Sequence, residues 1–168
     1  MASSPAQQQP LPPVRRVVTS HNAEGKATIL FDSVVNGIQA PHGPWLTPIW
    51  NSDDVPPDVN VTVDRSPVKT GIVNSGTVLR YVDFPPRSKG SVHRTISLDY
   101  VLVLNGQCVL TLDDGSRTPM KQGDICIQQA TMHSWDNESD EWCRLLCVLI
   151  HSKPPVVNGK ALGSNTHM

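Results

Sequence analysis

Short runs of apolar and β-branched residues, separated by turn residues, dominate the second half of the chain. Runs of this length and composition are typical of β-strands, and no window shows the 3.6-residue apolar spacing of an amphipathic helix. They lie at residues 77–84, 99–104, 107–112, 125–129 and 142–150. The pattern predicts an antiparallel all-β domain, either a sandwich or a barrel of short strands.

Turn sequences fall between these runs. Asn105 and Gly106 form the strongest signal, because an Asn-Gly pair readily adopts the positive φ angles of a two-residue hairpin turn. Proline, aspartate and glycine clusters at residues 85–86, 113–115 and 123–124 mark further turns. Consecutive strands are therefore expected to run antiparallel.

The first 76 residues are less regular. Strand-like runs at 14–18 and 26–31 flank a turn at 21–25 and predict a hairpin or an edge arm. Residues 36–76 are dense in Pro, Gly, Asn and Asp, which predicts long loops with room for one strand at 59–63. Trp45 and Trp50 are expected to pin this segment to the domain, and a lid over a pocket is the alternative.

Length and composition narrow the class of protein. The 168 residues, 38% hydrophobic and 17% charged, fit one globular domain, expected at 14–156 with its principal motifs at 77–150. A disordered tail is predicted at 1–13 and a flexible one at 157–168. The net charge of −1 gives no attraction to nucleic acid or anionic lipid. With no membrane-spanning run and no signal peptide recognised, a cytoplasmic location is predicted.

Four cysteines lie in strand-like segments rather than in loops. None belongs to a Cys-x-x-Cys pair, so a metal or redox motif of that kind is not indicated. We expect them to be small buried hydrophobes in a reducing compartment: Cys108, Cys126, Cys143 and Cys147.

Two blocks carry the residues suited to chemistry. In the first, His93, Thr95 and Asp99 stand two and six positions apart, and even separations along a strand place side chains on one face. In the second, a Gly-Asp turn at 123–124 is followed by an apolar strand, a short turn and His133. The sequence predicts that these blocks bring two histidines and one carboxylate together.

The two blocks resemble the paired motifs of the cupin superfamily, over residues 77–150. The first family motif contains Gly, His-x-His, a carboxylate and Gly, and the second contains Gly-Asp, Pro-x-Gly, His and Asn. The resemblance implies a double-stranded β-helix, or jelly-roll, barrel, here with an N-terminal strand arm. It also implies that His93, Asp99 and His133 occupy positions of metal ligands inside the barrel.

The chain departs from the family pattern at two ligand positions. Thr95 stands where the second histidine is expected, and Asp99 replaces a longer glutamate. Two histidines and one carboxylate still have the composition of a facial triad, which could hold Fe, Mn or Zn. The alternative is a metal-free barrel in which Asp99 and His133 act as acid and base. No organic cofactor is indicated.

Neighbouring residues supply the predicted substrate contacts. Packing is the alternative role for the two aromatic residues among them, and Gln128 stands where the family commonly has proline. The predicted contacts are Thr95, Arg94, Tyr100, Gln128 and Trp135.

Two classes of function remain open at this stage. The motifs resemble those of small fungal cupins associated with polyketide-type secondary metabolism, which implies an enzyme acting on a small organic molecule, as an oxidoreductase or as a lyase or isomerase. A non-catalytic small-molecule-binding module is the alternative, because this fold does not determine function. A homodimer that pairs through the 14–31 arm is also expected.

Overall fold

The computed structural model describes residues 11–40, 43–67, 69 and 72–166. Its named elements in these ranges are all strands, which confirms the predicted all-β class. No helix in the described part of the chain is long and apolar enough to cross a membrane. The tail predicted to be disordered at 1–13 lies mostly outside the described residues.

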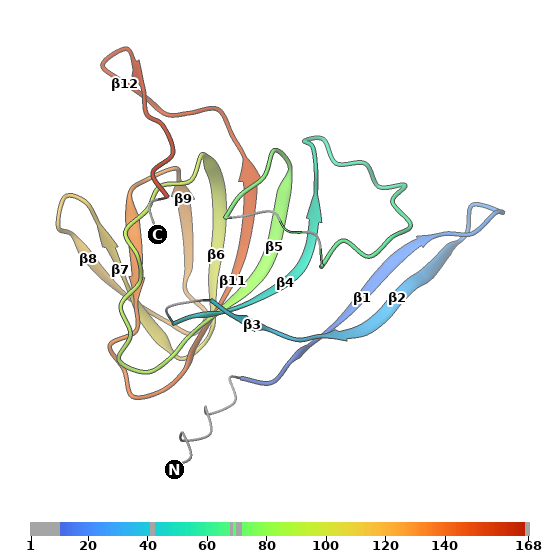
Figure 1. The fold of residues 1–168 in the computed structure, drawn as a ribbon, viewed down its shortest axis with the longest axis horizontal. Helices are drawn as coiled ribbons and strands as arrows, with labels where there is room; N and C mark the ends of the chain where they lie inside the picture. Colours follow the sequence, from blue (N-terminus) through green and yellow to red (C-terminus); the bar gives the residue numbers. More distant parts are fainter. Residues whose placement is uncertain (1–10, 41–42, 68, 70–71, 167–168) are drawn as a thin grey trace, which may run out of the picture.

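Two sheets form the barrel. The larger sheet has the order β3-β4-β5-β11-β6-β9 and the smaller has the order β10-β7-β8, both antiparallel. In Figure 1 the larger sheet is a curved wall, with β7 and β8 closing one side. The strands are β3 (Ile38–Gln39), β4 (Trp45–Ser52), β5 (Thr77–Phe84), β6 (Ser97–Asn105), β7 (Gln107–Leu112), β8 (Arg117–Lys121), β9 (Ile125–Gln129), β10 (His133–Asp136) and β11 (Cys143–His151).

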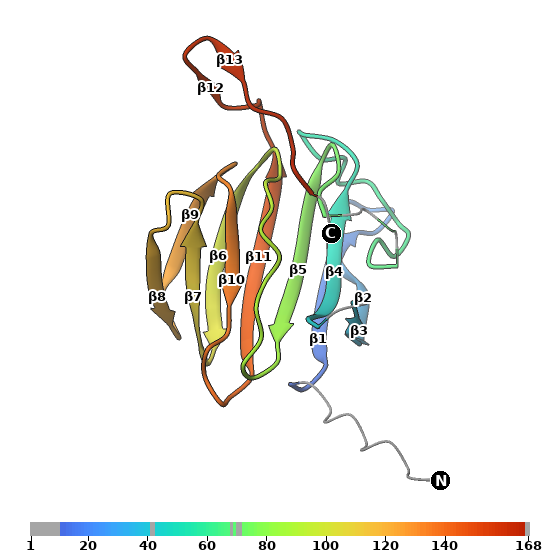
Figure 2. The same cartoon turned by 60° about the vertical axis from the view of Figure 1, so that its left-hand side comes forward.

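Two hairpins extend from this barrel. β1 (Val14–His21) and β2 (Ala27–Val35) pair into an arm that projects away from β7 and β8, as the sequence predicts. Past β11, the short hairpin of β12 (Val156–Val157) and β13 (Lys160–Ala161) rises above the barrel in Figure 2. The flexibility expected from residue 157 onward stays a prediction, although Asn165 pairs through its backbone with Arg94.

Alternate side chains of β11 fill the barrel interior. From Cys143 to Ile150 its odd-numbered residues are buried and its even-numbered residues are partly exposed, as expected for a strand with one face in the core. The core cluster takes side chains from both sheets: Val78, Val82, Phe84, Val101, Val103, Cys108, Met120, Trp135, Cys143, Leu145, Cys147 and Leu149. All four cysteines are free thiols, and all but Cys126 are fully buried.

The segment predicted as loops between 36 and 76 contains a full strand, β4. Its Pro48 lacks an N–H donor, which argues against a strand, but the β4–β5 register shifts between Pro48 and Trp50 and so accommodates the proline. The strand suggested at 59–63 is absent, and Val59 and Val63 are well exposed. Burial, rather than local composition, decided which part of this segment is strand.

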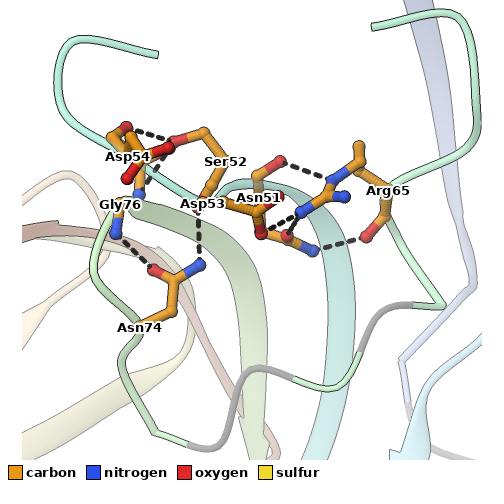
Figure 3. A network of polar contacts seen from close by, with 8 residues as sticks. Asn51, Ser52, Asp53, Asp54, Arg65, Asn74 and Gly76 are labelled. Carbon is orange, nitrogen blue, oxygen red and sulfur yellow. Dashed lines mark hydrogen bonds and ion pairs between the residues drawn. The ribbon is translucent and has the colours of Figure 1, made fainter. Parts of the chain in front are cut away.

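The long loop after β4 is tied down by polar contacts, shown in Figure 3. Asn51 Nδ2 donates to the Arg65 carbonyl, and the Arg65 guanidinium donates to Asn51 Oδ1. Arg65 also forms an ion pair with Asp53. At the far end, Asn74 Nδ2 donates to the Ser52 carbonyl, and Asn74 Oδ1 accepts from the Gly76 N–H. A Cβ on Gly76 would lie 2.2 Å from the Ser52 oxygen, so only glycine fits this closure.

Arg16 joins the arm to the barrel. Its guanidinium is buried, donates to the Ile49 carbonyl over 2.9 Å and pairs with Asp64. It also lies 5.8 Å from the ring centroids of Phe31 and Trp50. Hydrogen bonding to Arg16 lowers the pKa of Asp64 to about 2. Trp50 therefore belongs to the contact between the arm and β4.

Replacing Asp64 by alanine is expected to destabilise the protein by about 1–3 kcal/mol, because Arg16 would keep its buried charge without a carboxylate. Asp32→Ala is the control, since Asp32 pairs with Arg15 on the exposed side of the arm. Urea denaturation at neutral pH measures both. Equal effects of the two substitutions would contradict the role assigned to Arg16.

Candidate functional site

A cavity of about 570 Å³ opens between the two sheets. Its apolar lining comes mainly from β4, β5, β6, β10 and β11, and includes Leu46, Val82, Phe84, Val101, Trp135, Leu145 and Leu149. Its polar and charged lining includes Arg80, Lys89, Ser91, His93, Thr95, Asp99, Gln128 and His133. A largely apolar pocket with a few convergent polar groups is the usual form of a small-molecule site.

The two predicted histidines lie side by side in this cavity. His93, in the loop before β6, and His133, which begins β10, exchange backbone hydrogen bonds of 2.9 and 3.0 Å. Their ring centroids are 4.3 Å apart. Ala130, at φ 50°, turns the chain between β9 and β10. Left-handed backbone is costly for a residue with a Cβ, so this turn is held by its surroundings.

Both imidazoles are oriented by the backbone. Nδ1 of His93 lies 2.9 Å from the Ser91 carbonyl, and Nδ1 of His133 lies 2.9 Å from the Thr131 carbonyl. Because a carbonyl only accepts, each Nδ1 must carry the hydrogen, and each neutral ring has its lone pair on Nε2. Burial lowers the pKa of His133 to about 4. At neutral pH this ring is therefore unprotonated.

Asp99 is bound to Gln128 on the neighbouring strand. The two are register partners on β6 and β9, and Gln128 Nε2 donates to Asp99 Oδ2 over 2.7 Å. Burial raises the pKa of Asp99, against the opposing effects of Ser97, Arg80 and His93. Oδ1 of Asp99 and Oε1 of Gln128 are buried without a hydrogen-bond partner.

The residues that were expected to hold a metal do not form a complete ligand set. A histidine that donates its second ring nitrogen to a carbonyl has the orientation of a metal ligand, and the His93 and His133 pair fits that description. Across the described residues, however, no three His, Cys, Asp or Glu side chains converge as ligands. Asp99 is engaged by Gln128 instead, and the Thr95 hydroxyl accepts from Ser97.

Two predicted substrate contacts lie elsewhere. Tyr100 is 42% exposed because it follows Asp99 on β6 and faces the opposite side of the sheet. Arg94 does not line the cavity, and its backbone pairs with Asn165 outside it. Both predictions are corrected on this ground. Thr95, Gln128 and Trp135 do line the cavity.

Arg80, Lys89 and Ser91 line the cavity and were not predicted from the sequence, and Arg80 is the one that lies on a barrel strand. It lies on β5, between the buried Val78 and Val82, and therefore faces inward. A charged residue at an inward position of an apolar strand was the available signal. Both faces of β5 carry apolar residues, so alternation alone did not identify the inward one.

Fold and site together define a double-stranded β-helix barrel with a polar centre. Residues 80–149 match the cupin domain. The chain is 33% identical over 165 residues to the cupin-domain-containing oxidoreductase virC of Hypocrea virens, spanning 89% of this chain and 83% of the relative. It is 29% identical to the oryzines biosynthesis cluster protein J of Aspergillus oryzae, covering 92% of each. The chain belongs to the cupin family.

A solved structure extends the likeness of fold. The polyketide cyclase RemF of Streptomyces resistomycificus superposes with a TM-score of 0.51 over 80% of each chain, at 16% identity. At that identity the match supports the architecture alone. The predicted cupin barrel is thus confirmed.

The free energy of unfolding should decrease at acidic pH because of the lowered pKa of His133. Between pH 6.5 and about 4 the unfolded ring is protonated and the folded ring is neutral, so the free energy of unfolding decreases as pH falls through this window. The loss is on the order of 3 kcal/mol, and nothing is lost above the window. Urea denaturation with a chelator at pH 7.0 and about 4.5 should show a smaller loss for His133→Gln. An equal loss of unfolding free energy in wild type and His133→Gln would contradict the role of His133. His21→Gln, at an exposed position, is the control.

Proposed function

We propose that this chain is an enzyme of secondary metabolism that moves protons on a small, mainly apolar organic molecule in the barrel cavity. The paired imidazoles of His93 and His133, each with its Nε2 lone pair available, carry the proposal. The biosynthetic cluster named for one relative supports the metabolic setting. The cavity volume suits a substrate of one or a few rings.

The residues divide the chemistry between two walls of the cavity. His133, or His93 beside it, accepts a proton from a carbon next to a carbonyl group, at Nε2. Asp99 on β6, with its pKa raised by burial, is the group suited to return a proton. A substrate packed against the apolar lining would displace water from the site. Isomerisation needs only such proton transfers. Dehydration also breaks a C–O bond as the acid protonates the leaving hydroxyl, and cyclisation also forms a bond between the deprotonated carbon and an electrophilic carbon of the same substrate.

Oxidoreductase chemistry is a second candidate. The name of the Hypocrea virens relative favours it, as does the orientation of both histidines by backbone carbonyls. His93 and His133 would be the two protein ligands of a metal, which would supply the redox chemistry when bound. The described residues do not complete a three-ligand site, so no step is assigned to that metal.

Other expectations from the sequence stay predictions. A non-catalytic binding module would use the same cavity without proton transfer. Pairing of two copies through the arm is consistent with its exposed Val17, Ile29 and Val34. A cytoplasmic location likewise stays a prediction.

A ketone that fits the cavity tests the base directly. Wild-type protein in D2O should accelerate exchange of the methyl protons of 2-acetonaphthone at least about tenfold over buffer, because a positioned base removes them. His93→Asn and His133→Asn should lose this acceleration, measured by proton NMR. His151→Asn, at the exposed end of β11, is the matched control. If both site variants exchange like the wild type, the proposed bases are wrong.

Metal analysis separates the second candidate from the first. Protein purified without chelator is measured for Fe, Mn and Zn by mass spectrometry. The oxidoreductase candidate expects stoichiometric metal that is lost in His93→Asn and His133→Asn and kept in His151→Asn. Proton exchange that persists in metal-free wild-type protein supports the acid and base mechanism instead.

A further inference from the structure

Arg80 stands out as a charge inside an otherwise apolar part of the barrel. It is the register partner of Cys147 on β11, and Cys147 is in turn the partner of Val101 on β6. Its cross-strand neighbours in this register are therefore a thiol and an aliphatic group. A guanidinium is always charged in proteins, so this position holds a permanent, partly buried cation in the wall of the cavity.

Within the described chain no hydrogen bond or ion pair binds that charge, and the carboxylate of Asp99 acts on it only through space. Arg80 Nε is buried without a hydrogen-bond partner, and no ion pair joins the guanidinium to a described carboxylate. Burial lowers the pKa of Arg80, which reflects the cost of desolvating its charge. By contrast, the partly buried Arg144 is held by Asp83 through two hydrogen bonds of 2.6 Å. The chain thus pairs the partly buried Arg144 with a carboxylate, and it makes no such pair at Arg80.

Two more unpaired polar atoms belong to residues that line the same cavity. Asp99 and Gln128 are 4% and 3% exposed, and each has one buried oxygen without a partner. Unmatched buried groups are rare in folded proteins and indicate a missing partner. Three of them, on three strands around one cavity, indicate that a polar ligand completes the site.

We propose that Arg80 is the anchor for a carboxylate group of the substrate, whose apolar body fills the space between Arg80 and the histidine pair. A carboxylate matches the planar guanidinium with two hydrogen bonds and neutralises its charge. Asp99 lies two strands from Arg80 across β11, roughly 10 Å at the usual strand spacing, so one small molecule can span the gap. The inference rests on the proposed function, because it names the substrate class for the same cavity.

Matched probes that differ only in charge test the anchor. Wild-type protein should bind 2-naphthoate at least about tenfold more tightly than 2-naphthamide in isothermal titration calorimetry, since a charge-assisted pair forms only with the acid. Arg80→Met should lower the naphthoate affinity by about tenfold or more and leave the amide affinity nearly unchanged. Arg80→Lys should keep part of the preference. Arg87→Met, which removes an exposed surface arginine, is the matched control.

Thermal unfolding distinguishes a binding role from a structural one. An unpaired buried charge does not stabilise the ligand-free fold, so Arg80→Met should leave the melting temperature unchanged or raise it. A clear drop in melting temperature would assign Arg80 to structure and overturn the anchor. Equal wild-type affinity for acid and amide, no wild-type binding of naphthoate at millimolar concentration, or an intact preference in Arg80→Met would also overturn it.

The two proposals fail separately. If acid preference depends on Arg80 but ketone exchange does not depend on His93 or His133, the anchor stands and the proposed proton transfer is wrong. If exchange depends on the histidines but acid and amide bind alike, the proton transfer stands and the carboxylate anchor is wrong.

Discussion

The alternation of side chains along β11 is the constraint on which the rest of this structure depends. β11 pairs with both β5 and β6, so its register determines which faces of three strands point into the barrel. A slip of one residue would move Leu145 and its alternate neighbours to the outside. The register that buries the core also points Arg80 and Asp99 into the cavity, so fold and site have one origin.

The barrel interior has a packed apolar end and an open polar end, which follow one another along the strands. At the end formed by Val103, Cys108 and Cys143 the barrel is packed with apolar side chains. Toward the other end the inward positions become Asp99, Gln128 and His133, and an open cavity replaces packing. Buried polar atoms without partners lower the stability of the fold, so the packed end of the barrel must compensate for the cost of the cavity end. Such an arrangement is expected where a binding site is held by a rigid scaffold.

The sequence predicted the strands that have one buried face and clear turns. The bounds of β5, β7 and β9 agree with the predicted runs. β4 and β8 were not predicted, because each contains a proline, Pro48 and Pro119, which is unfavourable in a strand. Alternation along β6 and the residues just before it correctly placed Asp99 and Thr95 on the inward face. The same alternation places Tyr100 on the outer face, which the predicted substrate contact did not take into account. The contact between Asp99 and Gln128 depends on the pairing of β6 with β9, which no local pattern encodes.

The two departures from the family motif have a shared structural consequence. Thr95 is too short and too weak a ligand to join the histidines, and its hydroxyl is engaged by Ser97. Asp99, one methylene shorter than glutamate, is held by Gln128. The two substitutions thus turn a ligand set that would converge on one point into two separate centres, an imidazole pair and a carboxylate-amide pair. Separate centres can contact different atoms of one substrate, which acid and base chemistry requires and metal ligation does not.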